Sequence, residues 1–127
     1  MNEDVFTQLS AGEMAEGVQS GRWTARELVA ASLERIGRLD PELNAFTVVR
    51  TKEALAEADR LDAELAGEAK GRKADGASAP AAGAGRLLAG VPIAVKEEFD
   101  VAGLPTTLGG SGNPSPAAAD SEVIRRV

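Results

Sequence analysis

The residue with the clearest chemical potential is Lys96, which directly follows a short apolar run, Val91 to Val95. Such a run is typical of a buried β-strand, and its end would place the lysine at the carboxyl edge of a sheet. In open α/β sheets, ligands bind at this edge. Two acidic residues, Glu97 and Glu98, come next, and a turn-forming Gly-Leu-Pro begins at Gly103.

A lysine in that position has two interpretations. It can extend its ammonium group into water, as most lysines at strand ends do. Alternatively it is desolvated, gives up its proton and acts as a base. The chain has no His and no Cys, so it can supply neither a Ser-His-Asp base nor a thiol nucleophile nor a thiolate metal site. A base that works near neutral pH must therefore be a lysine or a perturbed carboxylate.

The residues around Lys96 favour the second interpretation. Gly90 to Lys96 reads Gly-Val-Pro-Ile-Ala-Val-Lys, and Asp100 to Thr107 reads Asp-Val-Ala-Gly-Leu-Pro-Thr-Thr. This pattern closely resembles the amidase signature family, whose members carry Gly-(Val/Ile)-Pro-x-x-Val-Lys and then Asp-Val-Ala-Gly-x-Pro-Thr-Thr. By this resemblance, Lys96 is the catalytic lysine of a Ser-Ser-Lys arrangement.

The resemblance implies hydrolysis of a small-molecule amide through an acyl-enzyme, with no cofactor and no metal. A serine would attack the carbonyl, and a second serine would relay its proton to Lys96. The resemblance implies that the nucleophile lies well downstream of the lysine and that neither serine is in this chain, so the chain alone is predicted to be inactive. Ser111 is interpreted as part of a Gly/Pro-rich turn. Thr106 and Thr107 either line the substrate site or form turn hydrogen bonds.

The sequence departs from the commonest family pattern directly after the lysine. Many members carry Asp-Asn there, whereas this chain has Glu97-Glu98-Phe99, which is more like the branch that includes fatty-acid amide hydrolases. On a strand, Glu98 would share the side of Lys96 and favour its charged form. Two alternatives stay open: an amidase-type subunit of a tRNA-linked amidotransferase, and a non-catalytic helical interaction fragment.

Composition limits the other classes of function. The 127 residues make at most one small domain, and three Phe and one Trp would give it a thin core. A net charge of −6 argues against nucleic-acid binding. We expect no membrane span, since no apolar run approaches the roughly 18 residues required. The absence of Cys and of a signal-peptide pattern at Met1 fits a cytoplasmic protein, with a homodimer as one alternative for its assembly.

Capping boxes predict two helices near the N-terminus. Ser10 and Glu13 begin one over 11–19, and Thr24 and Glu27 begin another that should stop before Pro41. The stretch 44–49 is β-branched and aromatic and is predicted to be a strand or an extended segment. A third helix is predicted over 52–68, with its charges on a solvated face.

The predicted fold class is α/β: a mixed sheet that starts near Leu88, covered by helices. We divide the chain into an N-terminal helical region (1–68), a flexible Ala/Gly-rich insertion (69–86) and the start of the amidase α/β core (87–127). A last helix should begin near Asp120, and its apolar stripe is interrupted at Val127. The chain is therefore expected to be the N-terminal part of a longer polypeptide, whose remainder completes the sheet.

Overall fold

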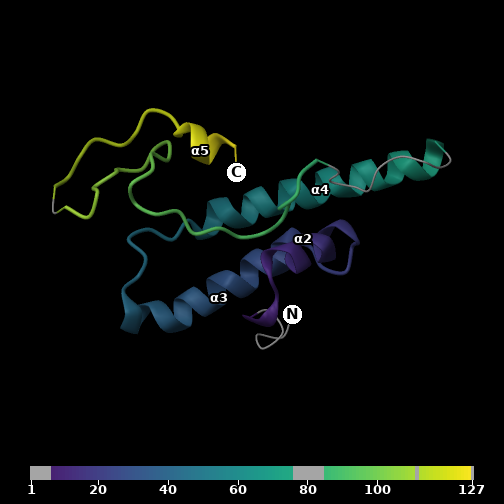
Figure 1. Cartoon of the computed structure of the whole chain (residues 1–127), viewed down its shortest axis with the longest axis horizontal. Helices are drawn as coiled ribbons and strands as arrows, with labels where there is room; N and C mark the ends of the chain where they lie inside the picture. The colour runs from purple at the N-terminus through teal and green to yellow at the C-terminus, as the bar shows by residue number, and fades with distance from the viewer. Residues whose placement is uncertain (1–6, 76–84, 111, 127) are drawn as a thin grey trace. The chain divides into compact units, whose positions relative to one another are not determined.

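The computed structural model describes residues 7–75, 85–110 and 112–126, and for 72–75 it describes the backbone only. The chain divides into two compact units, Met1–Pro92 and Ile93–Val127. Four helices are described: α2 (Ala11–Gln19), α3 (Ala25–Leu43), α4 (Thr51–Asp75) and α5 (Glu122–Arg125). The first three belong to the first unit and α5 belongs to the second (Figure 1).

Both predicted capping boxes are confirmed. At the start of α2, the Ser10 hydroxyl accepts the backbone N–H of Glu13 at 3.3 Å, and the Glu13 carboxylate accepts the N–H of Ser10 at 2.8 Å. At the start of α3, Thr24 and Glu27 make the same exchange at 3.1 and 2.8 Å. Each box satisfies N–H groups that a helix leaves without an intrahelical partner.

The prediction that the second helix stops before Pro41 is wrong, because α3 continues through it. Proline removes one N–H donor, but here it lies in the last turn, where few hydrogen bonds remain to be lost. The helix ends at Asn44, which is left-handed with a φ of 48° and donates its N–H to the Asp40 carbonyl at 2.7 Å. The Asp40 carboxylate then accepts the N–H of Ala45 at 2.7 Å, so the backbone beyond the helix is capped locally.

Helices α3 and α4 form an antiparallel hairpin, joined by residues 44–50 (Figure 1). Helix α2 contributes Val18 to the buried cluster, which also contains Leu28 of α3 and Leu65 of α4. Met14, Ala31 and Leu61 pack against this cluster. The apolar stripes of three helices thus meet in one small core, as amphipathic helices require.

Asp62 joins α4 to the N-terminus of α3. Its two carboxylate oxygens accept the backbone N–H groups of Ala25 at 2.7 Å and Arg26 at 3.1 Å. The Arg26 guanidinium in turn lies 2.6 Å from the Asp59 carboxylate. The prediction of a purely solvated charged face on this helix is therefore wrong at Asp62, which is half-buried and caps a neighbouring helix.

Helix α4 extends seven residues beyond the predicted end at Glu68, to Asp75. Its composition accounts for this, because 69–75 consists mainly of Ala, Lys and Arg, which are good helix formers, with Gly71 and the terminal Asp75 as the exceptions. Residues 76–84 of the proposed insertion lie outside the described residues. The division into three regions stays a prediction.

The predicted α/β fold class is wrong for the part of the chain that the structure describes, which is helical and contains no strand. The run before Lys96 has no neighbouring strand to pair with, and Ile93 and Val95 remain exposed. A strand satisfies its backbone N–H and C=O groups only by pairing, so strand propensity alone cannot produce a sheet. The predicted segment 44–49 likewise forms no strand.

Hydrogen bonds between the turn at 101–104 and the segment before α5 link two parts of the second unit. Gly103 donates its N–H to the carbonyl of Ala117, and Ala117 donates to that of Leu104, both at 2.9 Å. Ser121, which precedes α5, donates its N–H to the carbonyl of Asp100 at 2.9 Å. These contacts bring residues 100–104 alongside residues 117–121, next to the turn that carries Lys96.

Candidate functional site

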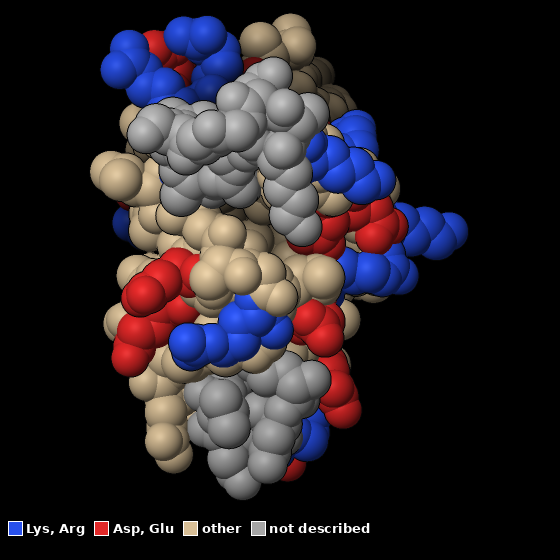
Figure 2. All heavy atoms as spheres, turned by 90° about the vertical axis from the view of Figure 1, so that its right-hand side faces the viewer, with Lys and Arg blue, Asp and Glu red and all other residues tan. Residues whose placement is uncertain are grey.

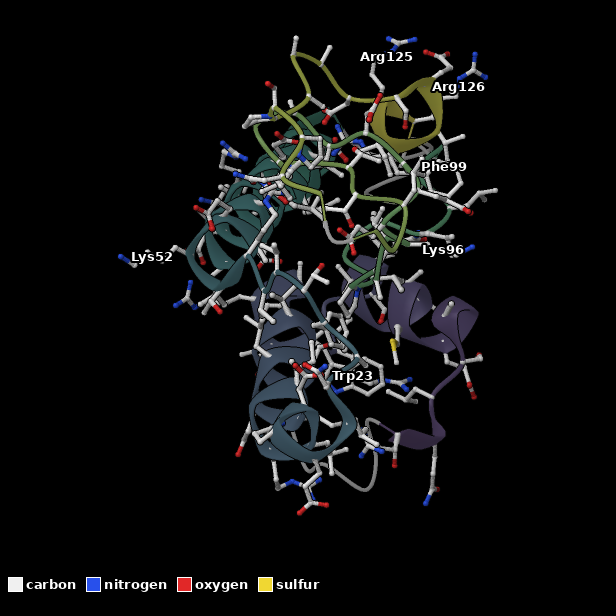
Figure 3. The ribbon with its side chains drawn as sticks, turned by 90° about the vertical axis from the view of Figure 1, so that its left-hand side faces the viewer. Trp23, Lys52, Lys96, Phe99, Arg125 and Arg126 are labelled. Carbon is white, nitrogen blue, oxygen red and sulfur yellow. The ribbon has the colours of Figure 1, made fainter. Side chains whose placement is uncertain are left out.

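Lys96 lies at the end of an extended segment in the second unit, where the chain turns. The N–H of Phe99 donates to the Lys96 carbonyl at 3.2 Å, which closes the turn over Glu97 and Glu98. The side chain is 75% exposed, and its Nζ lies 2.8 Å from Oε2 of Glu98 (Figure 3). Lys96 is therefore exposed and forms an ion pair with Glu98 across a turn, and not along the strand that the sequence predicted.

The two threonines of the motif fold back onto the same turn. The Thr107 hydroxyl donates to Oε1 of Glu97, and the Thr106 hydroxyl donates to Oδ1 of Asp100 at 2.6 Å. Both threonines are half-buried. Sequence reasoning left a choice between substrate contacts and turn hydrogen bonds, and in this structure both hydroxyls make hydrogen bonds within the loop.

A hollow of about 500 Å³ lies beside this loop, within the second unit. Its lining includes two carboxylates and three hydroxyl groups. The lining residues are Asp100, Thr106, Ser115, Ala117, Ala118, Ala119, Asp120 and Ser121. Neither Lys96 nor Thr107 contributes to it. The Ser121 hydroxyl oxygen is buried and has no hydrogen-bond partner within the described residues.

Sequence reasoning missed two features of the second unit. The Asp120 carboxylate accepts the N–H of Ala102 at 2.7 Å and so links residues 100–104 to residues 117–121. Its place directly before the N-cap Ser121 was the available signal, since Asp and Ser are typical of helix starts. At α5, the guanidinium groups of Arg125 and of the C-cap residue Arg126 lower the pKa of the Glu122 carboxyl below its ordinary value. These charges pair with one another and not with Lys96.

Charges of both signs are interspersed on the face drawn in Figure 2. Within the described ranges, no group of three or more acidic side chains is arranged to hold a metal ion. No helix in those ranges is both long enough and apolar enough to cross a membrane. Ser111, assigned to a turn by its neighbours, lies outside the described residues.

Comparison with known proteins places these residues in context. A family model described as Amidase matches residues 27–127. AmiA2 of Mycobacterium tuberculosis, provisionally named an amidase, is 45% identical over 104 residues, which is 82% of this chain and 18% of that protein. A glutamyl-tRNA(Gln) amidotransferase subunit from Corynebacterium diphtheriae is 43% identical over 102 residues, or 80% of this chain and 18% of that protein.

A solved structure is also similar in fold. It comes from a study of a vestigial protein complex and the evolutionary origins of an s-triazine catabolic enzyme, and it is the inhibitor-bound complex. The match has a TM-score of 0.72 at 36% identity, and it covers 93% of this chain and 23% of that chain. The present chain therefore spans about a fifth of the length of the proteins it matches.

Proposed function

Since the chain belongs to the Amidase family, we propose that the protein containing it hydrolyses amide bonds, with Lys96 as the catalytic base. The observation that carries this proposal is the pattern from Gly90 to Thr107, which lies entirely within the range matched by the family model. The relatives named as an amidase and an amidotransferase subunit support amide chemistry. The names of these relatives differ, so they do not define one substrate.

The proposed reaction proceeds through an acyl-enzyme. A serine oxygen attacks the amide carbonyl, and its proton passes through a second serine to the Lys96 amine. The C–N bond then breaks as that proton moves to the leaving amine, and water hydrolyses the resulting ester. By family resemblance both serines lie outside this chain, so the chain supplies the base alone and is expected to be inactive by itself.

For this role, Nζ of Lys96 must be neutral when substrate binds. In the described structure it is paired with Glu98 and open to water. A lysine becomes neutral near physiological pH when burial disfavours its charge and its partners are uncharged, such as serine hydroxyls. We therefore propose that the remaining polypeptide covers Lys96 and presents a hydroxyl to it.

Thr106 and Thr107 are proposed to support the substrate site. Their hydroxyls hold the loop between Glu97 and Asp100 through hydrogen bonds, and Thr106 also lines the hollow beside it. Either threonine would need to exchange its carboxylate partner for substrate in order to bind substrate directly. A role in shaping the loop requires no such exchange.

The substrate is proposed to be a small-molecule amide, and the partner of this chain is the remaining length of its own polypeptide. We propose a cytoplasmic location, which the lack of Cys favours. An amidotransferase subunit is the second candidate function, and the 43% identical relative is the observation in its favour. The Glu97-Glu98 pair argues against it, because the amidotransferase subunits usually keep Asp-Asn after the lysine.

The test is to assay the full-length protein on a panel of small amides and on glutamine. The Lys96→Ala variant should lose about 100-fold or more in kcat, since removal of a general base usually costs 10²–10⁴. Lys52→Ala, which removes an exposed lysine from the start of α4, is the matched control and should keep full activity. Glutamine hydrolysis that depends on glutamyl-tRNA would instead favour the amidotransferase, and absence of any amide hydrolysis would favour a non-catalytic fragment.

A further inference from the structure

We propose that Asp120 is a positioning residue for the loop 96–107, which carries the Lys96 turn and both threonines of the site. Oδ1 of Asp120 accepts the backbone N–H of Ala102 at 2.7 Å, and so binds this loop from the segment that precedes α5. The inference rests on the proposed function and adds to it a residue that acts through the loop.

The hydrogen bond that Asp120 makes lies beside two backbone hydrogen bonds between the same segments. Ser121 donates its N–H to the Asp100 carbonyl, and Gly103 donates its N–H to the Ala117 carbonyl, both at 2.9 Å. Among the described contacts between these two segments, that of Asp120 is the one made by a side chain. It is therefore the contact that a substitution can remove directly.

Asp100 connects this contact to the rest of the site. Its carboxylate accepts the Thr106 hydroxyl at 2.6 Å, and its carbonyl accepts the N–H from the segment before α5. One residue earlier, Phe99 donates its N–H to the Lys96 carbonyl and closes the turn that carries the amine. A shift of the backbone that Asp120 binds would therefore displace Lys96 and Thr106 together.

The contact requires an acceptor oxygen at Asp120 and does not require a charge. The charged groups of the helix that follows, Glu122, Arg125 and Arg126, pair with one another. A backbone N–H is a neutral donor, and the side-chain amide oxygen of asparagine accepts it as a carboxylate oxygen does. Asp120→Asn should therefore hold the loop in place, whereas Asp120→Ala removes the acceptor.

The experiment measures kcat and KM of the full-length protein and three variants, on the small amide that the natural protein hydrolyses fastest. Because a misplacement of about 1 Å can cost about 100-fold in rate, Asp120→Ala should lower kcat about tenfold or more. KM should change less, since the base acts after the substrate has bound. Asp120→Asn should keep kcat within about threefold of the original. Glu122→Ala, which removes an exposed carboxylate nearby, is the matched control and should keep full activity.

Amide hydrogen exchange, measured by mass spectrometry on peptides that cover residues 100–104, tests the contact itself. Loss of its acceptor speeds the exchange of an amide, so exchange there should be faster in Asp120→Ala. It should be unchanged in Asp120→Asn and in Glu122→Ala. A general folding defect would instead speed exchange in both units and lower the temperature of thermal unfolding.

The inference is overturned by an unchanged kcat in Asp120→Ala, by equal losses in Asp120→Asn and Asp120→Ala, or by exchange at 100–104 that Asp120→Ala does not alter. If Asp120→Ala does not fold, Asp120→Asn decides, because the inference requires that variant to stay active with unchanged exchange. Activity retained in Lys96→Ala would contradict the proposed function, and the exchange measurement would still report on the contact of Asp120.

Discussion

At the scale of single residues, the surroundings of the Lys96 amine decide whether it can act as a base. Its amine is three-quarters exposed and touches one carboxylate, whereas a base requires a drier and less acidic setting. We propose that the remaining polypeptide supplies this drier and less acidic setting by covering Lys96. The loop beside Lys96 is held by the two threonines, whose hydroxyls donate to Asp100 and Glu97.

Gly17 offers a test of packing in the first unit. A Cβ added there would lie 2.0 Å from the Trp23 ring, so Gly17→Ala should force the indole out of place. We expect the free energy of unfolding to fall by about 1–3 kcal/mol, as for overpacked sites. Thermal unfolding of the full-length protein measures the change.

Gly37→Ala is the matched control for this substitution. Gly37 lies within α3 and has nothing within 4 Å of an added Cβ. Here the substitution should raise stability by about 0.5–1 kcal/mol, because alanine favours the helix. An equal effect of both substitutions would show that Trp23 does not pack on Gly17.

At the scale of elements, the starts of α2 and α3 depend on a few polar groups. Capping boxes begin α2 and α3, and Asp62 adds a cap from the neighbouring helix. These contacts fix where each helix begins. They also explain why the hairpin of α3 and α4 forms despite a small core, since Asp62 links the two helices at the point where their packing starts.

Replacing Asp62 tests the contribution of this cap. Asp62→Ala leaves the N–H groups of Ala25 and Arg26 without their acceptor, and should reduce the free energy of unfolding by about 0.5–2 kcal/mol. Asp59→Ala removes only the exposed ion pair with Arg26 and should cost less than about 1 kcal/mol. Urea unfolding compares the two variants, and a larger loss in Asp59→Ala would contradict the capping role.

The capping box of α3 also predicts a pH dependence. Hydrogen bonds from the Thr24 backbone, opposed by weak desolvation, lower the pKa of the Glu27 carboxyl below its ordinary 4.5. The stabilisation is therefore fully present above 4.5 and is lost as pH falls through the lower pKa of the folded state. Unfolding curves of the natural protein and Glu27→Ala should differ near neutral pH and converge in acid. A gap of constant size across the acid range would contradict this assignment.

At the scale of the whole molecule, large apolar side chains remain exposed in both units, including Leu87, Ile93 and Leu108. Scattered exposed residues are normal, but few large apolar residues here are fully buried, and Leu28 is the largest of them. This distribution agrees with a chain that spans about a fifth of its relatives. We expect the remaining polypeptide to cover these side chains.

The isolated chain tests this expectation. It should bind a hydrophobic dye such as ANS strongly and should show no amide hydrolysis, because the proposed mechanism needs serines that the family resemblance places outside this chain. The full-length protein should bind the dye weakly and be active. Activity of the isolated chain at a rate similar to that of the full-length protein would contradict the division of the site.

Features that depend on residues close together in the sequence were predicted correctly more often than features that depend on contacts between distant segments. The capping boxes at Ser10 and Thr24 were predicted because each depends on residues three apart. The end of α3 was misjudged because Asp40 and the left-handed Asn44 cap the chain beyond Pro41. The sheet was predicted from apolar runs such as Val91 to Val95, but a strand needs a partner that the described residues do not provide. On a strand, Glu98 was expected to share the side of Lys96; the two side chains do meet, but on a turn, and the roles of Asp62 and Asp120 depend on contacts between distant segments.

The most direct test of the account is chemical rescue of Lys96→Ala by small alkylamines in the full-length protein. If Lys96 acts as a base, the variant should have about 1% or less of the original kcat and should recover activity in proportion to the concentration of unprotonated amine. Lys52→Ala should be fully active and indifferent to added amine. Activity of Lys96→Ala within about tenfold of the original, without amine, would contradict a base role for this residue.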